Sequence, residues 1–241
     1  MYKPIYTVSR AIFIANNVPM EHKQDIQMLA TLLEQSPYHF TVTRLFDELA
    51  TQRNIRDVFQ SLADEDIDGR VFIFLAGQSK LDADTNTQYY MCADSNGDLE
   101  SSAMSYVEIG QLCSICSAKH VGLILDTPID LLGYFMNNFL EFGRILASNP
   151  KERKSHQFMM RDSQLEYSLA RAFHEYLTTP QSESISMFYM LYRRVHMRES
   201  YPNGLHLSFK NDGYGDFLFD ENSFDAWIER IAEERKKRHE E

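Results

Sequence analysis

Three short, continuous apolar runs constrain the fold of this chain more than any other feature. They span Ala11–Ala15, Val71–Leu75 and Val121–Leu125. Strands that are apolar on both faces are typical of a parallel sheet covered by helices on both sides. A fourth segment, Tyr38–Leu45, alternates more loosely and predicts a strand nearer the edge of that sheet.

Helical patterns lie between these runs. Apolar residues recur at helical spacing in three segments, 26–33, 55–62 and 109–116, and Met28 is expected to widen the buried stripe of the first. Thr51 is expected to cap the second helix, while Ser105 and Glu108 form a capping box for the third. Alternating strands and helices predict an α/β fold with right-handed crossovers.

The pattern changes at residues 147–156, a polar stretch that contains Pro150 and three basic residues, Lys151, Arg153 and Lys154. Such composition predicts an exposed loop. Several elements are expected after it: a strand at 157–160, helices at 163–177 and 184–198, strands at 205–209 and 216–219 around a polar turn at 210–215, and a helix at 223–238 whose charged end is solvated. No repeat divides the chain, which is expected to form one domain over residues 1–241.

Composition excludes several classes of protein. The chain has 241 residues, of which 44% are hydrophobic, so it should fold around a core. Its formal net charge of −11 argues against binding to nucleic acid or to an anionic membrane. Three cysteines are too few for a disulfide scaffold and favour a reducing compartment. With neither a secretory signal nor a bilayer-spanning apolar stretch in the sequence, we expect a cytoplasmic protein.

Two of the apolar runs end in motifs that are similar to those of a protease family. The second continues into Ala76-Gly77-Gln78-Ser79, where caspases have Ser-Gly-His-Gly, and the third into Asp126-Thr127-Pro128, where they have Leu-Asp-Ala-Cys. The segment Tyr89–Asp94 is similar to the family's Tyr-Leu-Leu-Pro-x-Asp hairpin. From about Ser9 to Phe219, the chain therefore resembles the caspase fold in its metacaspase or bacterial caspase-like form.

This resemblance implies a three-layer α/β fold, with a mostly parallel central sheet of about six strands and helices on both faces. It also implies an internal division of the domain. A large-subunit-like half covers about 9–146, a basic linker loop 147–156, a small-subunit-like half 157–220 and a C-terminal helix 221–241.

The resemblance further implies that both catalytic positions have lost their chemistry. Gln78 and Pro128 are 50 residues apart, the interval that separates the catalytic His and Cys of caspases. Gln78 has an amide that cannot act as a general base, and Pro128 has no side-chain heteroatom that could attack a carbonyl. Ser79 also replaces the second glycine of the family motif. We therefore expect a pseudoenzyme with no catalytic residues, no cofactor and no metal.

Two alternatives remain open at the same strand ends. The hydroxyls of Ser79 and Thr127 could serve a cysteine-independent hydrolase of altered mechanism, although no base accompanies them and His120 lies at the other end of its strand, roughly 20 Å away. Alternatively, the vestigial cleft could bind a peptide or small ligand through five residues: Gly77, Gln78, Ser79, Asp126 and Thr127. Asp126 matches a metacaspase residue that lines an acidic pocket for a basic side chain. The alternative for Asp126 is a buried, hydrogen-bonded carboxylate at the end of a strand.

The expected function is regulation or scaffolding of a protein partner, in particular an active caspase-like protease of a cell-death or defence pathway, or a second copy of the chain. The strand at 205–209 permits either of two arrangements. It could pair with a second copy, because the last strand pairs across a two-fold axis in dimeric caspases, or it could be an edge strand, because metacaspases block that edge. Lys151, Arg153 and Lys154 occupy the place where caspase-like proteins are cut between their halves, so a protease with basic specificity could cleave there. The alternative interpretation of these basic residues is a solvated charged loop with no role in cleavage.

Two further motifs favour structural roles. Cys113 and Cys116 form a CxxC, but both fall on the apolar stripe of a helix, which favours core thiols over a redox or zinc site. The acidic segment Asp64–Gly69 matches half of an EF-hand, yet the position of the bidentate Glu is Leu75, inside a buried strand. A solvated acidic turn is favoured over a looser calcium site.

Overall fold

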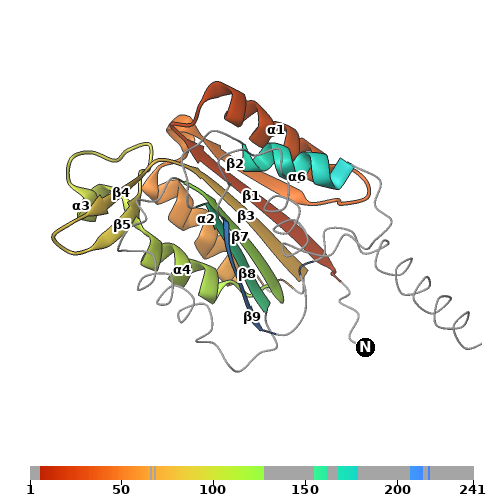
Figure 1. The fold of residues 1–241 in the computed structure, drawn as a ribbon. Coiled ribbons are helices and arrows are strands. Elements are labelled where there is room, and N and C mark those ends of the chain that lie inside the picture. Colours follow the sequence, from red (N-terminus) through yellow and green to blue (C-terminus); the bar gives the residue numbers. More distant parts are fainter. Residues whose placement is uncertain are drawn as a thin grey trace, which may run out of the picture.

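The computed structural model describes residues 6–65, 67, 69–127, 155–161, 168–178, 207–213 and 217 (Figure 1). Its central sheet has the strand order β2-β1-β3-β7-β8-β9. The strands are β1 (Val8–Asn16), β2 (Thr41–Phe46), β3 (Gly69–Gly77), β7 (His120–Asp126), β8 (Ser155–Arg161) and β9 (Leu207–Gly213). Neighbouring strands run parallel as far as β8, and β9 pairs antiparallel to β8. The prediction of an α/β fold with a parallel sheet is confirmed, and β2 lies at an edge as expected.

Helices cover both faces of the sheet (Figure 1). One face carries α1 (Met20–Glu34) and α6 (Leu169–Thr178), and the other carries α2 (Gln52–Asp64) and α4 (Tyr106–Ile115). Successive strand residues point to opposite faces, so the apolar runs divide between two cores. The core under α1 and α6 takes the aromatic residues of β1 and β3, namely Phe13, Phe72 and Phe74. The core under α2 and α4 takes their aliphatic residues, namely Ile12, Ile14, Val71, Ile73 and Leu75.

The predicted helix caps are present. Thr51 accepts a hydrogen bond from the backbone N–H of Asn54 at 3.2 Å, and Ser105 accepts one from Glu108 at 3.1 Å. Each bond satisfies a backbone donor that the first turn of a helix leaves free. The expectation that Met28 belongs to the buried stripe of α1 is wrong, because this side chain is 51% exposed.

A small antiparallel sheet follows β3 directly. It has the order β4-β5-β6 and comprises β4 (Ser79–Asp82), β5 (Thr87–Tyr90) and β6 (Met104–Ser105). A short helix, α3 (Leu99–Ser102), lies between β5 and β6, and another, η1 (Asp47–Leu49), follows β2. In Figure 1 this sheet lies at the left, beyond one end of the central sheet.

Several boundaries in the second half of the chain differ from those predicted. Strand β8 begins at Ser155, so the last two residues of the expected loop 147–156 are strand. Strand β9 continues to Gly213, so the expected turn at 210–215 is wrong over its first four residues. Ser168 lies outside any helix and its Oγ accepts the Arg171 N–H at 3.2 Å, so α6 begins at Leu169 rather than Ser163. Ser168 therefore caps the N-terminal end of α6. Residues 163–167 of the expected helix lie outside the described residues.

Phe217 belongs to no strand, although a strand was expected at 216–219. It is fully buried and stacks on Phe40, with ring centroids 6.5 Å apart. Other predicted features lie outside the described residues: Pro128, the basic residues Lys151, Arg153 and Lys154, the helices at 184–198 and 223–238, and the acidic residues Asp66 and Asp68. Within the described ranges, no helix combines the length and apolarity needed to cross a membrane.

Candidate functional site

The carboxyl ends of three neighbouring strands meet at one edge of the central sheet. Asn16 at the end of β1 pairs in register with Gly77 of β3, and Ala76 of β3 pairs with Asp126 of β7. The strand register therefore brings the predicted cleft residues of β3 and β7 to the same edge. In parallel α/β sheets, ligand sites lie outside this edge.

Gly77 is the tightest point of this edge. Its φ of +153° lies in a region that side-chain-bearing residues rarely adopt. A Cβ atom placed on it would lie 2.6 Å from the backbone oxygen of Asn16 and 2.9 Å from Cε2 of Tyr90. The Tyr90 hydroxyl donates a hydrogen bond to the carbonyl of Ala76 at 3.1 Å, and burial raises the pKa of this phenol well above its usual value. The protonated Tyr90 thus lies across the end of β3, in contact with the glycine backbone.

Gln78 directs its side chain toward solvent while its backbone is tied down. Its carbonyl accepts the N–H of Met91 at 3.0 Å, and the carbonyl of Met91 accepts Nδ2 of Asn16 at 3.0 Å. The return segment of the hairpin therefore joins the ends of β1 and β3. The side chain of Gln78 is exposed at the expected histidine position. Its neutral amide cannot take up a proton near neutral pH.

The two hydroxyls considered as alternative nucleophiles both have hydrogen-bond partners. Ser79 Oγ accepts Nε2 of Gln88 at 2.8 Å. Thr127 is fully buried, and its hydroxyl shares a hydrogen bond with the hydroxyl of Tyr106. Amides and phenols do not act as general bases at neutral pH, so these contacts do not activate either hydroxyl.

Asp126 is 1% exposed at the end of β7. The carboxylate is therefore enclosed at the sheet edge, which agrees with a buried strand-end Asp and differs from a solvent-open acidic pocket. His120 lies at the opposite end of the same strand, as predicted, where its ring packs edge-on against Tyr6 with centroids 5.4 Å apart.

Three residues of this edge were missed in the sequence: Asn16, Tyr90 and Tyr106. Asn16 carried a usable signal, because it is a polar residue at the end of a buried run, as Asp126 is. Tyr106 carried none, because its contact with Thr127 joins residues 21 positions apart through the packing of α4 beside β7.

The cysteines are buried thiols, as expected for the CxxC pair. Cys113 and Cys116 are both fully buried, and burial raises the pKa of Cys113 well above its usual value. Burial, with a smaller effect from the negative charge of Asp94, raises the pKa of Cys92 to about 12. Thiols with such values carry almost no thiolate near neutral pH and are poor nucleophiles. Among the residues described, no group of three or more His, Cys, Asp or Glu could hold a metal ion.

Comparisons with known proteins give a likeness of fold alone. No protein-family model matches the chain, and no curated protein matches it. Among solved structures, protein GSU0716 from Geobacter sulfurreducens, a Northeast Structural Genomics target, is similar with a TM-score of 0.56. The match covers 87% of this chain and 95% of that one, at 12% sequence identity.

Proposed function

We propose that this protein is a catalytically inactive, caspase-like protein that acts by binding a protein partner. The single observation that carries the proposal is the exposed amide of Gln78, held at the end of β3 where the resemblance expects the catalytic imidazole. A protein with this sheet edge but without a catalytic histidine can bind a partner protein there without cleaving it.

The sheet supports the caspase-like part of the proposal. Its order β2-β1-β3-β7-β8-β9, with only the last strand antiparallel, agrees with the mostly parallel sheet of about six strands that the resemblance implies. Tyr89 and Tyr90, which begin the segment that is similar to the family motif, lie in β5, the second strand of the hairpin after Gln78.

A panel of fluorogenic peptides with Arg, Lys or Asp at the cleavage position tests the loss of catalysis. We expect no turnover above background. Turnover that Ser79→Ala abolishes would overturn the proposal, because Ser79 is the half-buried hydroxyl of this edge and remains accessible to a substrate. Thr127→Ala serves as the second variant, checked by circular dichroism because its side chain is fully buried.

Partner binding needs a separate test. We propose an active caspase-like protease of a cell-death or defence pathway as the partner, captured from the native source with the wild-type chain as bait. A protease bound by the wild type and lost with Gln78→Lys supports the proposal. Gln60→Lys is the matched control, because it makes the same substitution at an exposed residue in the C-terminal half of α2. Equal capture of the protease by Gln78→Lys and by the wild type would contradict binding at the strand ends around Gln78.

Cleavage of the basic segment that ends at Lys154 is a second element of the proposal. This segment directly precedes β8, which pairs with β7 on one side and β9 on the other. Strand pairing on both sides would hold the two halves together after a cut. We expect trypsin at low concentration to give two fragments that co-elute in size-exclusion chromatography; first cleavage elsewhere in the chain would contradict this element.

A further inference from the structure

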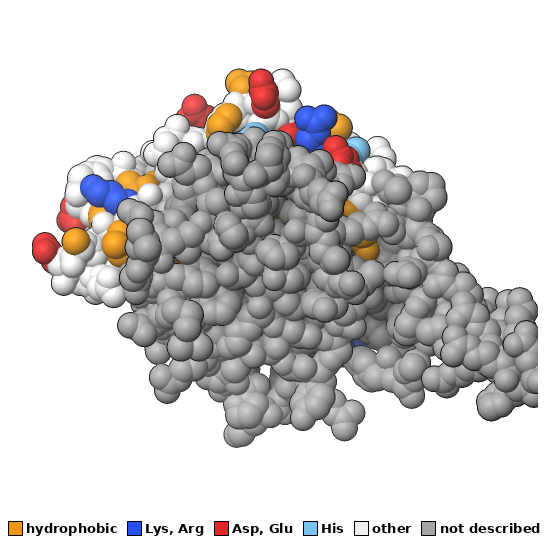
Figure 2. All heavy atoms as spheres, in the orientation of Figure 1, with side chains coloured by type: hydrophobic (Ala, Val, Ile, Leu, Met, Phe, Trp, Pro, Cys, Tyr) orange, Lys and Arg blue, Asp and Glu red, His pale blue; other side chains and the backbone are white. Residues whose placement is uncertain are grey.

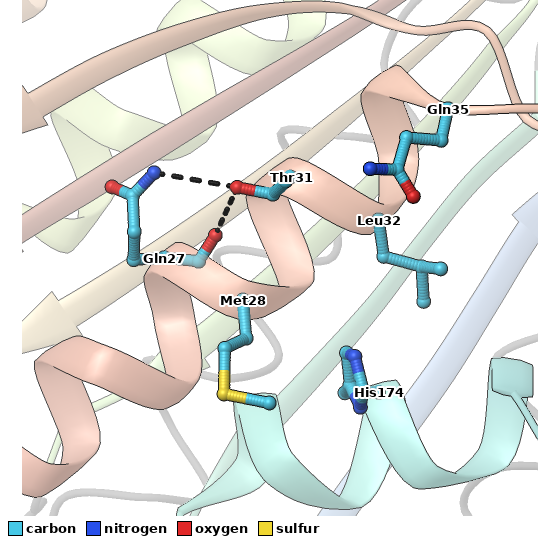
Figure 3. Close-up of a pocket in the computed structure, with 6 residues that line it drawn as sticks. All are labelled: Gln27, Met28, Thr31, Leu32, Gln35 and His174. Carbon is cyan, nitrogen blue, oxygen red and sulfur yellow. Dashed lines mark hydrogen bonds between the residues drawn. The ribbon is translucent and has the colours of Figure 1, made fainter.

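An open groove runs between α1 and α6 on the outer side of the helical layer. It encloses about 260 Å³ and is lined by Gln27, Met28, Thr31, Leu32, Gln35 and His174. Figure 3 shows Met28 and Leu32 of α1 turned toward the space in which His174 of α6 stands. Met28 is 51% exposed there, so its apolar side chain is open to an occupant of the groove.

Two of the polar residues beside this groove are engaged with each other. Nε2 of Gln27 lies 3.5 Å from Oγ1 of Thr31, and that hydroxyl donates to the carbonyl of Gln27 at 2.9 Å (Figure 3). Gln35 and His174 also line the groove, and Met28 and Leu32 form the apolar part of its wall. An occupant of this groove must bring apolar side chains at a spacing that matches a helix surface.

The C-terminal segment, which lies outside the described residues, has that pattern and also ends in a run of basic residues. Residues 223–238 place Phe224, Trp227, Ile228 and Ile231 at i, i+3, i+4 and i+7, an apolar stripe on one face of a helix. The opposite face is charged, and four consecutive basic residues, 235–238, close the segment.

The last described residue leads to this groove. Phe217 stacks on Phe40, whose N–H is bonded to the carbonyl of Leu33 at 2.8 Å, so Phe217 lies close to the C-terminal end of α1. The six steps from Phe217 to residue 223 span at most about 20 Å, which is enough to pass from the core to the outer side of a helix of about 10 Å diameter.

Length and charge then fix an orientation. A helix from Phe224 to Arg238 is about 21 Å long, which equals the distance along α1 from Gln35 back to Glu21 at 1.5 Å per residue. In this antiparallel arrangement the basic end reaches Glu21 and Asp25 in the first two turns of α1. Neither carboxylate forms an ion pair with another described residue, whereas Glu34 at the other end of α1 is paired with Arg44. Figure 2 shows hydrophobic and acidic side chains next to one another over α1.

We propose that the C-terminal segment 223–238 binds as an amphipathic helix in the groove between α1 and α6, antiparallel to α1. Trp227 and Ile231 pack on Leu32 and Met28, and the basic residues lie beside Glu21 and Asp25. A partner helix that uses this face must first displace the protein's own C-terminal segment.

Trp227 is the only tryptophan of the chain, so its fluorescence reports this contact directly. In the full-length wild-type protein we expect blue-shifted emission and protection from acrylamide. Met28→Glu and Leu32→Glu, each checked for folding by circular dichroism, should shift the emission to the red and raise acrylamide quenching several-fold. Ile115→Glu is the control: it places the same charge at an exposed apolar residue of α4, on the other face of the sheet.

Three results would overturn the proposal. The first is Trp227 emission in the folded wild type that equals the emission in urea. The second is buried Trp227 that neither Met28→Glu nor Leu32→Glu affects, which would place the segment elsewhere. The third is an emission shift that appears only as protein concentration rises, together with a dimer in light scattering, which would assign the groove to a second copy. Glu21→Lys with Asp25→Lys should weaken the protection of Trp227, and an unchanged value would refute the antiparallel orientation.

Discussion

Replacing Gly77 by Ala should destabilise the protein strongly. The new Cβ would lie 2.6 Å from the Asn16 carbonyl oxygen and 3.2 Å from the Tyr90 hydroxyl, as well as close to the Tyr90 ring. The carbonyl belongs to a paired strand and cannot move without disturbing β1. Alanine would also have to adopt a φ near +153°.

The two costs can be estimated separately. A residue other than glycine in a sparsely populated backbone region costs about 1–3 kcal/mol. An extra methyl group forced into a closely packed site costs about 1–3 kcal/mol more. The expected loss in the free energy of unfolding is therefore about 2–6 kcal/mol, which lowers Tm by roughly 4–24 °C in a chain of this size.

Urea denaturation followed by circular dichroism measures this loss. Gly97→Ala is the matched control, because its Cβ would meet no atom within 4 Å. We expect that variant to stay within about 0.5 kcal/mol of wild type. If Gly77→Ala is as stable as Gly97→Ala, with the same dependence on urea, the close approach of Tyr90 and Asn16 to Gly77 is wrong.

Three further predictions concern other parts of the fold. Thr51→Ala removes the acceptor of the Asn54 N–H and should cost about 1 kcal/mol in urea denaturation, where no change would mean that water replaces the cap. Tyr106→Phe leaves the buried hydroxyl of Thr127 without this partner and should cost about 1–3 kcal/mol; a neutral effect would contradict the hydrogen bond. Because the pKa of Cys92 is raised from its ordinary 9.0 to about 12, its contribution to stability should be present below pH 9 and be lost as the pH rises toward 12. The same shift predicts that iodoacetamide at pH 8.5 labels Cys92 only after unfolding, and fast labelling of the folded protein would refute it.

The sequence was informative where local patterns determine structure. Continuous apolar runs predicted β1, β3 and β7, and Thr51 and Ser105 predicted the starts of α2 and α4. These signals depend on a few neighbouring residues, so one chain suffices to interpret them.

The apolar pattern of the sequence was insufficient where contacts between distant segments determine the position of a side chain. Met28 fits the apolar period of α1, yet the neighbouring helix α6 lies beside it and leaves it half exposed. Phe217 was assigned to a strand because its neighbours are apolar, whereas stacking on Phe40 and Phe72 determines its position. At the candidate site, the motif resemblance pointed to Gln78 and Asp126, but only packing could reveal that the first is exposed and the second enclosed.

The separation of aromatic and aliphatic side chains between the two faces of β1 and β3 has a consequence for the fidelity of folding. A shift of either strand by one residue would exchange the faces. Phe13, Phe72 or Phe74 would then enter the side where the strands carry isoleucine, valine and leucine, and the smaller aliphatic side chains would replace rings on the other side. A sheet with similar residues on both faces would tolerate such a slip. Here the difference in side-chain size destabilises shifted registers while the chain is still folding. The side chains of β1 and β3 therefore help to select the native register.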